Sequence, residues 1–333
     1  MKKKFVLILA LALVGSMAFA AFNFSGEAEV GYKFDLANGG VSTYGYDANT
    51  SYFAMNATTD FAKVAFRLVP GDNDFHYMQA QAAISLYLDK ALAAKGVDLP
   101  VSLTAYIGDA SNSGFYSYTD PNSIVDDSYD GFNKNTRTNY PIGFDVGYAG
   151  YTARTMFDIV GTDVNPVFSV KGTPVDGVSF AASFLAANKY IAGSDSEVNL
   201  SATADVAALA GLDFNLKASV FTVLGMGSSV TGDPLLLAAV TGGKDAINVY
   251  AEYSLNATAD NNNSVAGSRV FAGASYALTD VTLGGGLDYE FADTLLSYSV
   301  YAKSTLGGVT YKAVLGGNAD GALYIKTQAY LAF

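Results

Sequence analysis

The chain has 333 residues and a formal net charge of −12, with 31 aspartate and glutamate residues against 19 lysine and arginine residues. This balance argues against nucleic acid as a partner, because phosphate binding needs clustered basic side chains, and the absence of cysteine excludes a disulfide framework and a thiolate metal site. Half of the residues are hydrophobic and no change of composition marks a linker, so we interpret residues 21–333 as one domain.

The first twenty residues have the pattern of a secretory signal peptide that is cleaved after Ala20. Lysines at positions 2–4 form a positive start, residues 5–14 form a short apolar core, and Ala18 and Ala20 supply the small side chains that cleavage requires. Removal of the three lysines leaves a mature charge of 16 − 31 = −15. The apolar core is too short for a membrane-spanning helix, which needs about 20 residues, and no later apolar run is long enough either.

From residue 22 onwards the sequence alternates between apolar and polar residues with a period of two, which is typical of strands that have one apolar face. A polar, glycine-rich loop is expected at 35–50. The expected strands, about eighteen in number, fall at residues 22–34, 51–58, 62–68, 78–88, 101–107, 142–148, 153–159, 168–171, 178–184, 198–206, 212–220, 235–241, 247–255, 269–276, 281–291, 296–303, 309–315 and 323–333.

Residues 109–140 form the longest stretch without this alternation and are rich in Asp, Asn, Ser and Tyr. Asp126 and Asp130 match the opening of a calcium-binding loop, but Lys134 and Arg137 stand at its ninth and twelfth positions, where calcium needs an oxygen ligand and a bidentate carboxylate. We therefore expect no metal site here and no cofactor.

The single histidine, His76, lies beside Asp74 in a presumed loop. General-base catalysis would need a nucleophile or an activated water that a partner side chain orients, and the sequence places neither beside His76. We therefore interpret the protein as a non-enzyme.

The last strand carries a resemblance to a known family. Ile325, Leu331 and Phe333 fall on its apolar side and Lys326 on the other. An amphipathic final strand that ends on an aromatic residue resembles the C-terminal assembly signal of bacterial outer-membrane β-barrel proteins, over residues 323–333. The resemblance implies that the barrel-insertion machinery reads Ile325, Leu331 and Phe333, that periplasmic chaperones are partners during export, and that outer-membrane lipid surrounds the folded chain.

The charged residues of the expected strands fall on one face, and the opposite face carries none. Because an arginine or lysine on the lipid face costs about 2–4 kcal/mol at the bilayer midplane, a membrane would impose this exclusion. A secreted, soluble β-sandwich also alternates and is the alternative fold. The candidate lumen-lining residues are Glu27, Glu29, Lys33, Lys63, Arg67, Arg154, Asp158, Lys217, Glu252, Arg269, Lys303, Lys312 and Lys326, and the same face carries Asp145, Lys171, Asp205, Asp213, Asp288 and Glu290.

Backbone polar groups in a bilayer must all find partners within the protein, so the sheet must close on itself. We expect an all-β, antiparallel, up-and-down transmembrane barrel of about 16–18 strands, or 14 if weak strands merge. Short turns are expected at the periplasmic end, near residues 59–60, Gly150, 242–243 and 279–280, with longer polar loops at the other end.

A barrel of this size leaves an aqueous channel unless a segment plugs it, and charges on its inner face would hydrate and filter that channel. We therefore expect a porin-like channel for passive diffusion of small hydrophilic solutes and ions. The stretch 109–140 would be the third outer loop, which in porins commonly folds inward, and an exposed surface loop is the alternative. Its candidate constriction residues are Asp120, Asp126, Asp127, Asp130, Lys134 and Arg137.

The ten bases and nine acids on the charged face nearly balance, so the surplus of negative charge falls in loops and turns and predicts a weak cation preference. Two other functions stay open. A structural or adhesive surface barrel would have a closed lumen, and a transporter of hydrophobic substrates would need an apolar interior. By analogy with porins, a homo-oligomer is possible.

Overall fold

The computed structural model describes residues 21–44, 52–71, 74–108, 142–160, 163–186, 193–257 and 267–332. These residues form one antiparallel sheet with two short helices, α2 (Leu88–Ala93) and α4 (Val206–Ala210). The strands are β1 (Ala21–Asp35), β2 (Gly40–Tyr44), β3 (Tyr52–Thr58), β4 (Ala62–Gly71), β5 (Asp74–Tyr87), β6 (Ser102–Gly108), β7 (Ile142–Tyr148), β8 (Tyr151–Val160), β9 (Asp163–Val175), β10 (Val178–Leu185), β11 (Ser196–Asp205), β12 (Asn215–Met226), β13 (Leu235–Lys244), β14 (Ile247–Ala257), β15 (Gly267–Ala277), β16 (Val281–Glu290), β17 (Leu295–Leu306), β18 (Val309–Asn318) and β19 (Leu323–Ala332).

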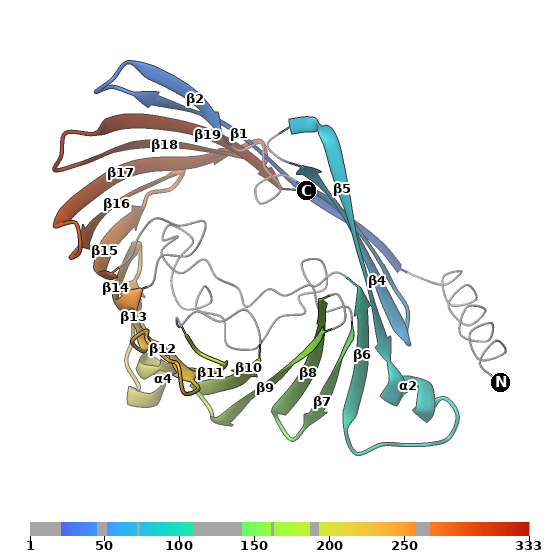
Figure 1. Ribbon diagram of the computed structural model, residues 1–333. Helices are drawn as coiled ribbons and strands as arrows, with labels where there is room; N and C mark the ends of the chain where they lie inside the picture. The colour runs from blue at the N-terminus through green and yellow to red at the C-terminus, as the bar shows by residue number, and fades with distance from the viewer. Residues whose placement is uncertain are drawn as a thin grey trace.

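The sheet closes into a barrel because the first and last strands pair with each other (Figure 1). Residues 27–35 of β1 pair with β19, residues 21–27 pair with β3, and residues 31–35 pair with β2. Strands β2 and β3 thus share one position beside β1, and the barrel has 18 strand positions. This confirms the expected closed antiparallel barrel of about eighteen strands.

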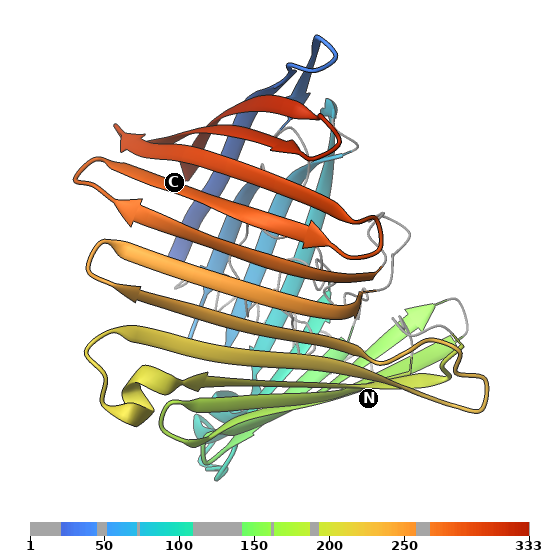
Figure 2. The same ribbon diagram turned by 90° about the vertical axis from the view of Figure 1, so that its left-hand side faces the viewer.

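Neighbouring strands are joined by hairpins, and Figure 2 shows β13–β19 lying side by side in chain order. At one end of the barrel the connections are tight. The Gly307–Gly308 pair has positive φ at both residues, as the two-residue hairpin turn that matches strand twist requires. The same end carries α2 and α4. No helix within the described ranges is both long and apolar enough to cross a membrane.

Three local expectations are wrong. His76 was expected in a loop, but it lies within β5. The turn expected at residues 242–243 lies instead at 245–246, where Asp245 adopts the left-handed conformation at φ 53, and both glycines continue β13. Aspartate tolerates that conformation, so no glycine is needed for the turn. The loop expected at 35–50 contains β2, because the β-branched residues Val41 and Thr43 extend the pairing along β1.

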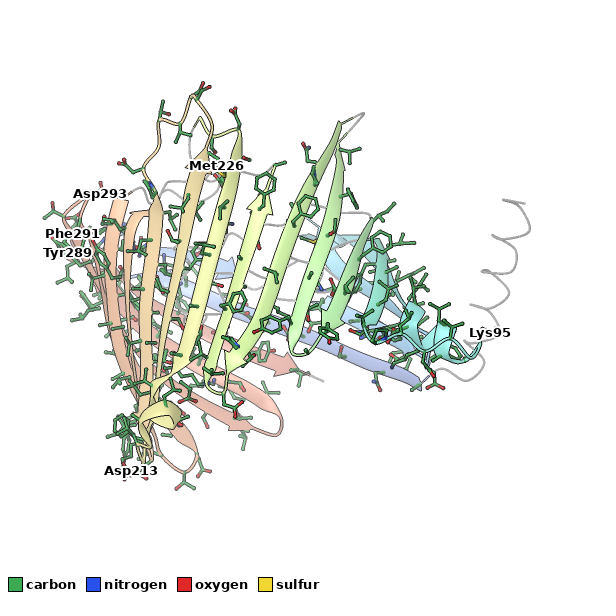
Figure 3. All side chains as sticks on the ribbon, turned by 90° about the horizontal axis from the view of Figure 1, so that it is seen from below. Lys95, Asp213, Met226, Tyr289, Phe291 and Asp293 are labelled. Carbon is green, nitrogen blue, oxygen red and sulfur yellow. The ribbon has the colours of Figure 1, made fainter. Side chains whose placement is uncertain are left out.

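Side chains alternate between two environments along the strands, as Figure 3 shows. On β1, Glu29 is 9% exposed whereas Val30 is 44% and Phe24 is 59% exposed. Side chains on the concave face of a closed barrel are crowded, so the less exposed set points inward. The outer face then carries large apolar side chains on every side, from Phe24 on β1 to Leu331 on β19.

Candidate functional site: the inner wall of the barrel

The structure places most of the predicted charged-face residues on the inner wall. One of the further charged-face residues lies elsewhere, and its assignment is corrected here. Asp205 keeps its predicted face, since it ends β11 directly opposite Lys217, and it also caps α4, with its Oδ1 accepting the Ala208 N–H at 2.9 Å. Asp213 precedes β12 and pairs with exposed Lys244 at 2.7 Å, at one end of the strands (Figure 3). The inner set contains Glu27, Glu29, Lys33, Lys63, Arg67, Asp145, Arg154, Lys171, Lys217, Glu252, Arg269, Asp288, Glu290, Lys303, Lys312 and Lys326.

Several predicted site residues lie outside the described part of the structure. They are the candidate constriction residues Asp120, Asp126, Asp127, Asp130, Lys134 and Arg137, the terminal Phe333, and the side chains of Asp158 and His76. The connection that contains the constriction candidates joins β6 to β7, at the end opposite the tight turns. Of the proposed assembly signal, Ile325 and Leu331 point outward and are 36% and 37% exposed.

A first charged cluster joins β6, β7 and β8. Asp145 and Arg154 are directly opposed across β7 and β8. Arg154 donates from Nε to Asp145 Oδ1 and from Nη2 to Oδ2, both at 2.7 Å, and the Tyr106 hydroxyl donates to the same Oδ2 at 3.0 Å. Such a two-point pair is strong and directional. It holds both charges against the wall.

A second cluster carries an excess of acid on β14, β15 and β16. Arg269 donates from Nε to Asp288 Oδ1 at 3.0 Å and contacts Asp288 Oδ2 through Nη2, which also lies 3.3 Å from Glu290 Oε1. Glu252 lies on the adjoining strand and is 5% exposed. One guanidinium therefore stands among three carboxyl groups.

A third cluster places a tyrosine between opposite charges. The Tyr52 hydroxyl donates to Glu27 Oε1 at 3.0 Å, and the Arg67 guanidinium lies 4.0 Å from the centroid of the Tyr52 ring. The ring is attracted to the cation through its face and to the carboxylate through its hydroxyl. Acid and base thus line neighbouring parts of the same wall.

Inner-wall tyrosines lie flat on glycines of the adjacent strand. A Cβ added at Gly273, Gly284 or Gly316 would lie 2.3–2.4 Å from the side chain of Tyr250, Tyr301 or Tyr324, respectively. Each ring occupies the space that a side chain on the neighbouring strand would fill, so it packs along the wall. The sequence shows the tyrosines and the glycines, but their contact depends on cross-strand register.

The inner wall is not charged throughout. Towards the end opposite the tight turns, Met156, Val167 and Leu185 form a fully buried cluster, with Tyr106 packed against it. Farther round, the inner sides of β12 and β13 are also apolar and buried, at Phe221, Val223, Leu235 and Leu237. These residues were not predicted to face inward, because the apolar face was assigned to the exterior. Leu235–Leu237 are consecutive leucines and carry no period of two.

Sequence reasoning also missed Glu197, which is fully buried on the inner side of β11. The Ser194 hydroxyl donates to its Oε1 at 3.4 Å. Glu197 stands at the start of the strand, before the apolar alternation begins at Val198, so its face could not be assigned from the period. Asn199 was the available signal: it is polar and lies two residues after Glu197, so the two side chains share a face of the strand.

A polar hollow of about 310 Å³ lies in the wall near the tight-turn end of β8–β11. Hydroxyl side chains dominate its lining, and Lys171 is the charged residue there. The hydroxyl-bearing residues are Thr152, Thr173, Ser179, Ser201 and Thr203. In the described ranges no group of three or more His, Cys, Asp or Glu side chains is placed to hold a metal ion.

Of the comparisons with known proteins, the one with solved structures supports the fold. No protein-family model and no curated protein matches the chain. Among solved structures, a mutant of the Rh. blastica porin is 13% identical and matches with a TM-score of 0.54, over 94% of this chain and 100% of that one. A triple mutant of Rhodopseudomonas blastica porin is 13% identical and matches with a TM-score of 0.52, over 94% of this chain and 100% of that one. A third solved structure, described by the words "asymmetric conductivity of engineered proteins", is 13% identical and matches with a TM-score of 0.54, over 94% of this chain and 100% of that one. The chain has a porin-like β-barrel fold.

Proposed function

We propose that this protein is a bacterial outer-membrane channel for passive diffusion of small hydrophilic solutes and ions, exported with a signal peptide that is cleaved after Ala20. One observation carries the proposal. The barrel has 18 strand positions, charged and hydroxyl side chains on its inner wall, and large apolar side chains on its outer face. A barrel of this circumference leaves a water-filled passage unless a segment plugs it.

The buried apolar residues on the inner sides of β12 and β13 favour a second candidate. These apolar side chains reduce the polar area of the inner wall. Such a wall is expected of a surface barrel whose lumen is closed, or of a carrier for apolar solutes. The charged clusters at Arg154, Arg269 and Arg67 favour the diffusion channel, because a carrier for apolar molecules would not place ionised groups along its path.

Solute uptake distinguishes these candidates. Vesicles that contain the refolded mature chain, residues 21–333, should swell quickly in an isosmotic solution of a small sugar and slowly in one of a large dextran. The reason is that a water-filled pore admits solutes by size. Vesicles without protein are the control, and equal swelling rates in the two kinds of vesicle would favour the closed surface barrel.

We also propose a weak cation preference, with the constriction formed by Asp120, Asp126, Asp127, Asp130, Lys134 and Arg137. The mature chain has 16 basic and 31 acidic residues, and the described inner wall holds more basic than acidic residues, so the entrances carry the excess of acid. Under a salt gradient the reversal potential should have the sign of cation preference and should shrink as ionic strength rises. The opposite sign at low salt would contradict this account.

A further inference from the structure

Four lysines lie on the inner wall of four consecutive strands: Lys303 on β17, Lys312 on β18, Lys326 on β19 and Lys33 on β1. We call this set the lysine ladder. Lys303 is directly opposite Lys312, and Lys326 is directly opposite Lys33. Directly opposed like charges destabilise an antiparallel pair. Stability of the sheet therefore does not explain two such pairs side by side.

The lysine ladder runs obliquely along the barrel. Lys303 stands three residues before the end of β17 at Leu306, beside the tight turn, whereas Lys33 stands two residues before the end of β1 at Asp35, at the opposite end. Rows of paired residues run perpendicular to strands, and barrel strands tilt by about 35–45°. With a diagonal step from Lys312 to Lys326, the ladder thus runs obliquely from near the tight-turn end of β17 towards the opposite end of β1.

Tyrosine rings position the ammonium groups of the lysine ladder. Lys33 and Lys326 lie 4.7 and 5.3 Å from the centroid of the Tyr324 ring, and Lys312 lies 4.9 Å from that of Tyr301. Both rings lie flat on glycines, as described above. A ring attracts a cation through its face, so the rings hold the ammonium groups at the wall without adding a negative charge.

Three of the four ladder lysines have no described carboxylate at salt-bridge distance. In the ranges that the structure describes, Lys33, Lys303 and Lys312 form no ion pair with a carboxylate. Asp35 follows Lys33 on the same side of β1, but its oxygens accept the backbone N–H groups of Ala37 and Asn38 and the Asn38 side-chain amide, at 2.9–3.0 Å. The Asp35 carboxylate is thus held in its turn and attracts Lys33 only from beyond salt-bridge distance.

We propose that the lysine ladder binds small multivalent oxyanions, of the class of phosphate esters and diphosphates, as they pass through the lumen. Opposed and diagonal residues in a sheet lie about 5–8 Å apart, so one diphosphate can contact two or three ammonium groups. Thr305, Thr310 and Gln328 border the lysines and offer neutral donors. A bound anion would also relieve the repulsion between the opposed pairs. The access of solute to the ladder rests on the proposed channel function.

Thermal unfolding in the presence of inorganic pyrophosphate tests the binding directly. The refolded mature chain should gain melting temperature as pyrophosphate rises, because a ligand that binds the folded state stabilises it. In the variant K33Q/K303Q/K312Q/K326Q the half-saturating concentration should rise by about tenfold or more. The matched control is K63Q/K217Q, which removes two other inner-wall lysines and should behave as the wild type.

The double variants K33Q/K326Q and K303Q/K312Q each remove one opposed pair and should give intermediate losses. An equal response of wild type and ladder variant, or no response of the wild type, would overturn the proposal. This readout needs no conduction. A protein that binds pyrophosphate but passes no current would contradict the channel and leave the anion site in place, whereas pores that pyrophosphate neither blocks nor stabilises would contradict the ladder alone.

Discussion

Replacing Val300 by arginine should lower the free energy of unfolding in lipid vesicles by about 2–4 kcal/mol, because Val300 stands at the middle of β17 and points outward. An arginine there would lie in the hydrocarbon core, where its charge has no water and no counterion. Denaturant titration of the variant in vesicles measures the change.

The matched control for this prediction is Ser299→Arg, which places the same side chain one residue earlier, on the inner side of β17. Arginine there would face the lumen, and we expect a change below about 1 kcal/mol. If Ser299→Arg proved the more damaging substitution, the assignment of inner and outer faces would be reversed and the membrane account would fail.

Replacing Arg269 by methionine should destabilise the barrel by about 3–5 kcal/mol, since it leaves the carboxyl groups of Asp288 and Glu290 side by side without their guanidinium. The Arg269 side chain is 12% exposed, so water compensates little. Unfolding of the purified variant in denaturant measures the loss.

Two further variants test the cause of this loss. Lys217→Met removes an exposed inner-wall cation from β12 and should cost less than about 1 kcal/mol. The triple variant R269M/D288N/E290Q removes the guanidinium together with the two carboxylates that pair with it, and it should recover most of the lost stability. If the triple variant were no more stable than Arg269→Met, packing of the arginine stem and not charge would account for the effect.

The fold could be predicted because the barrel repeats a simple rule. In β1 the alternation from Phe24 to Phe34 puts Glu27, Glu29 and Lys33 on one side, and the structure turns that side inward. The last strand has the same pattern, and its pairing with β1 closes the sheet. Period-two patterning therefore determined both the strands and the orientation of their faces.

Other features could not be predicted because they depend on register or on burial from both sides. The contact of Tyr301 with Gly284 exists only because β16 and β17 pair in one register, which fixes Gly284 opposite Tyr301. The inward position of Leu235 and Leu237 could not be predicted, because they lie in an apolar run in which the residues of both faces are hydrophobic enough to contact lipid. Strand β2 was missed because glycine and polar residues on both sides gave the segment the composition of a loop.

The Asp145–Arg154 pair shows an intermediate case. Its residues were both assigned to the charged face by alternation, but their direct contact follows from the tight turn at residues 149–150, which fixes the register of β7 and β8. The turn near Gly150 was expected from the sequence, and counting residues outward from it places Asp145 opposite Arg154. The tyrosine that completes the cluster, Tyr106, comes from β6 and needed the structure.

Single-channel recording tests the central claim most directly. The mature chain, refolded in detergent and added to a planar bilayer under a salt gradient, should insert in discrete steps of stable conductance. Such steps require a continuous water-filled passage through the barrel. Folding into a β-rich, heat-modifiable form that inserts into the bilayer yet gives no current would contradict the diffusion channel and favour a closed surface barrel.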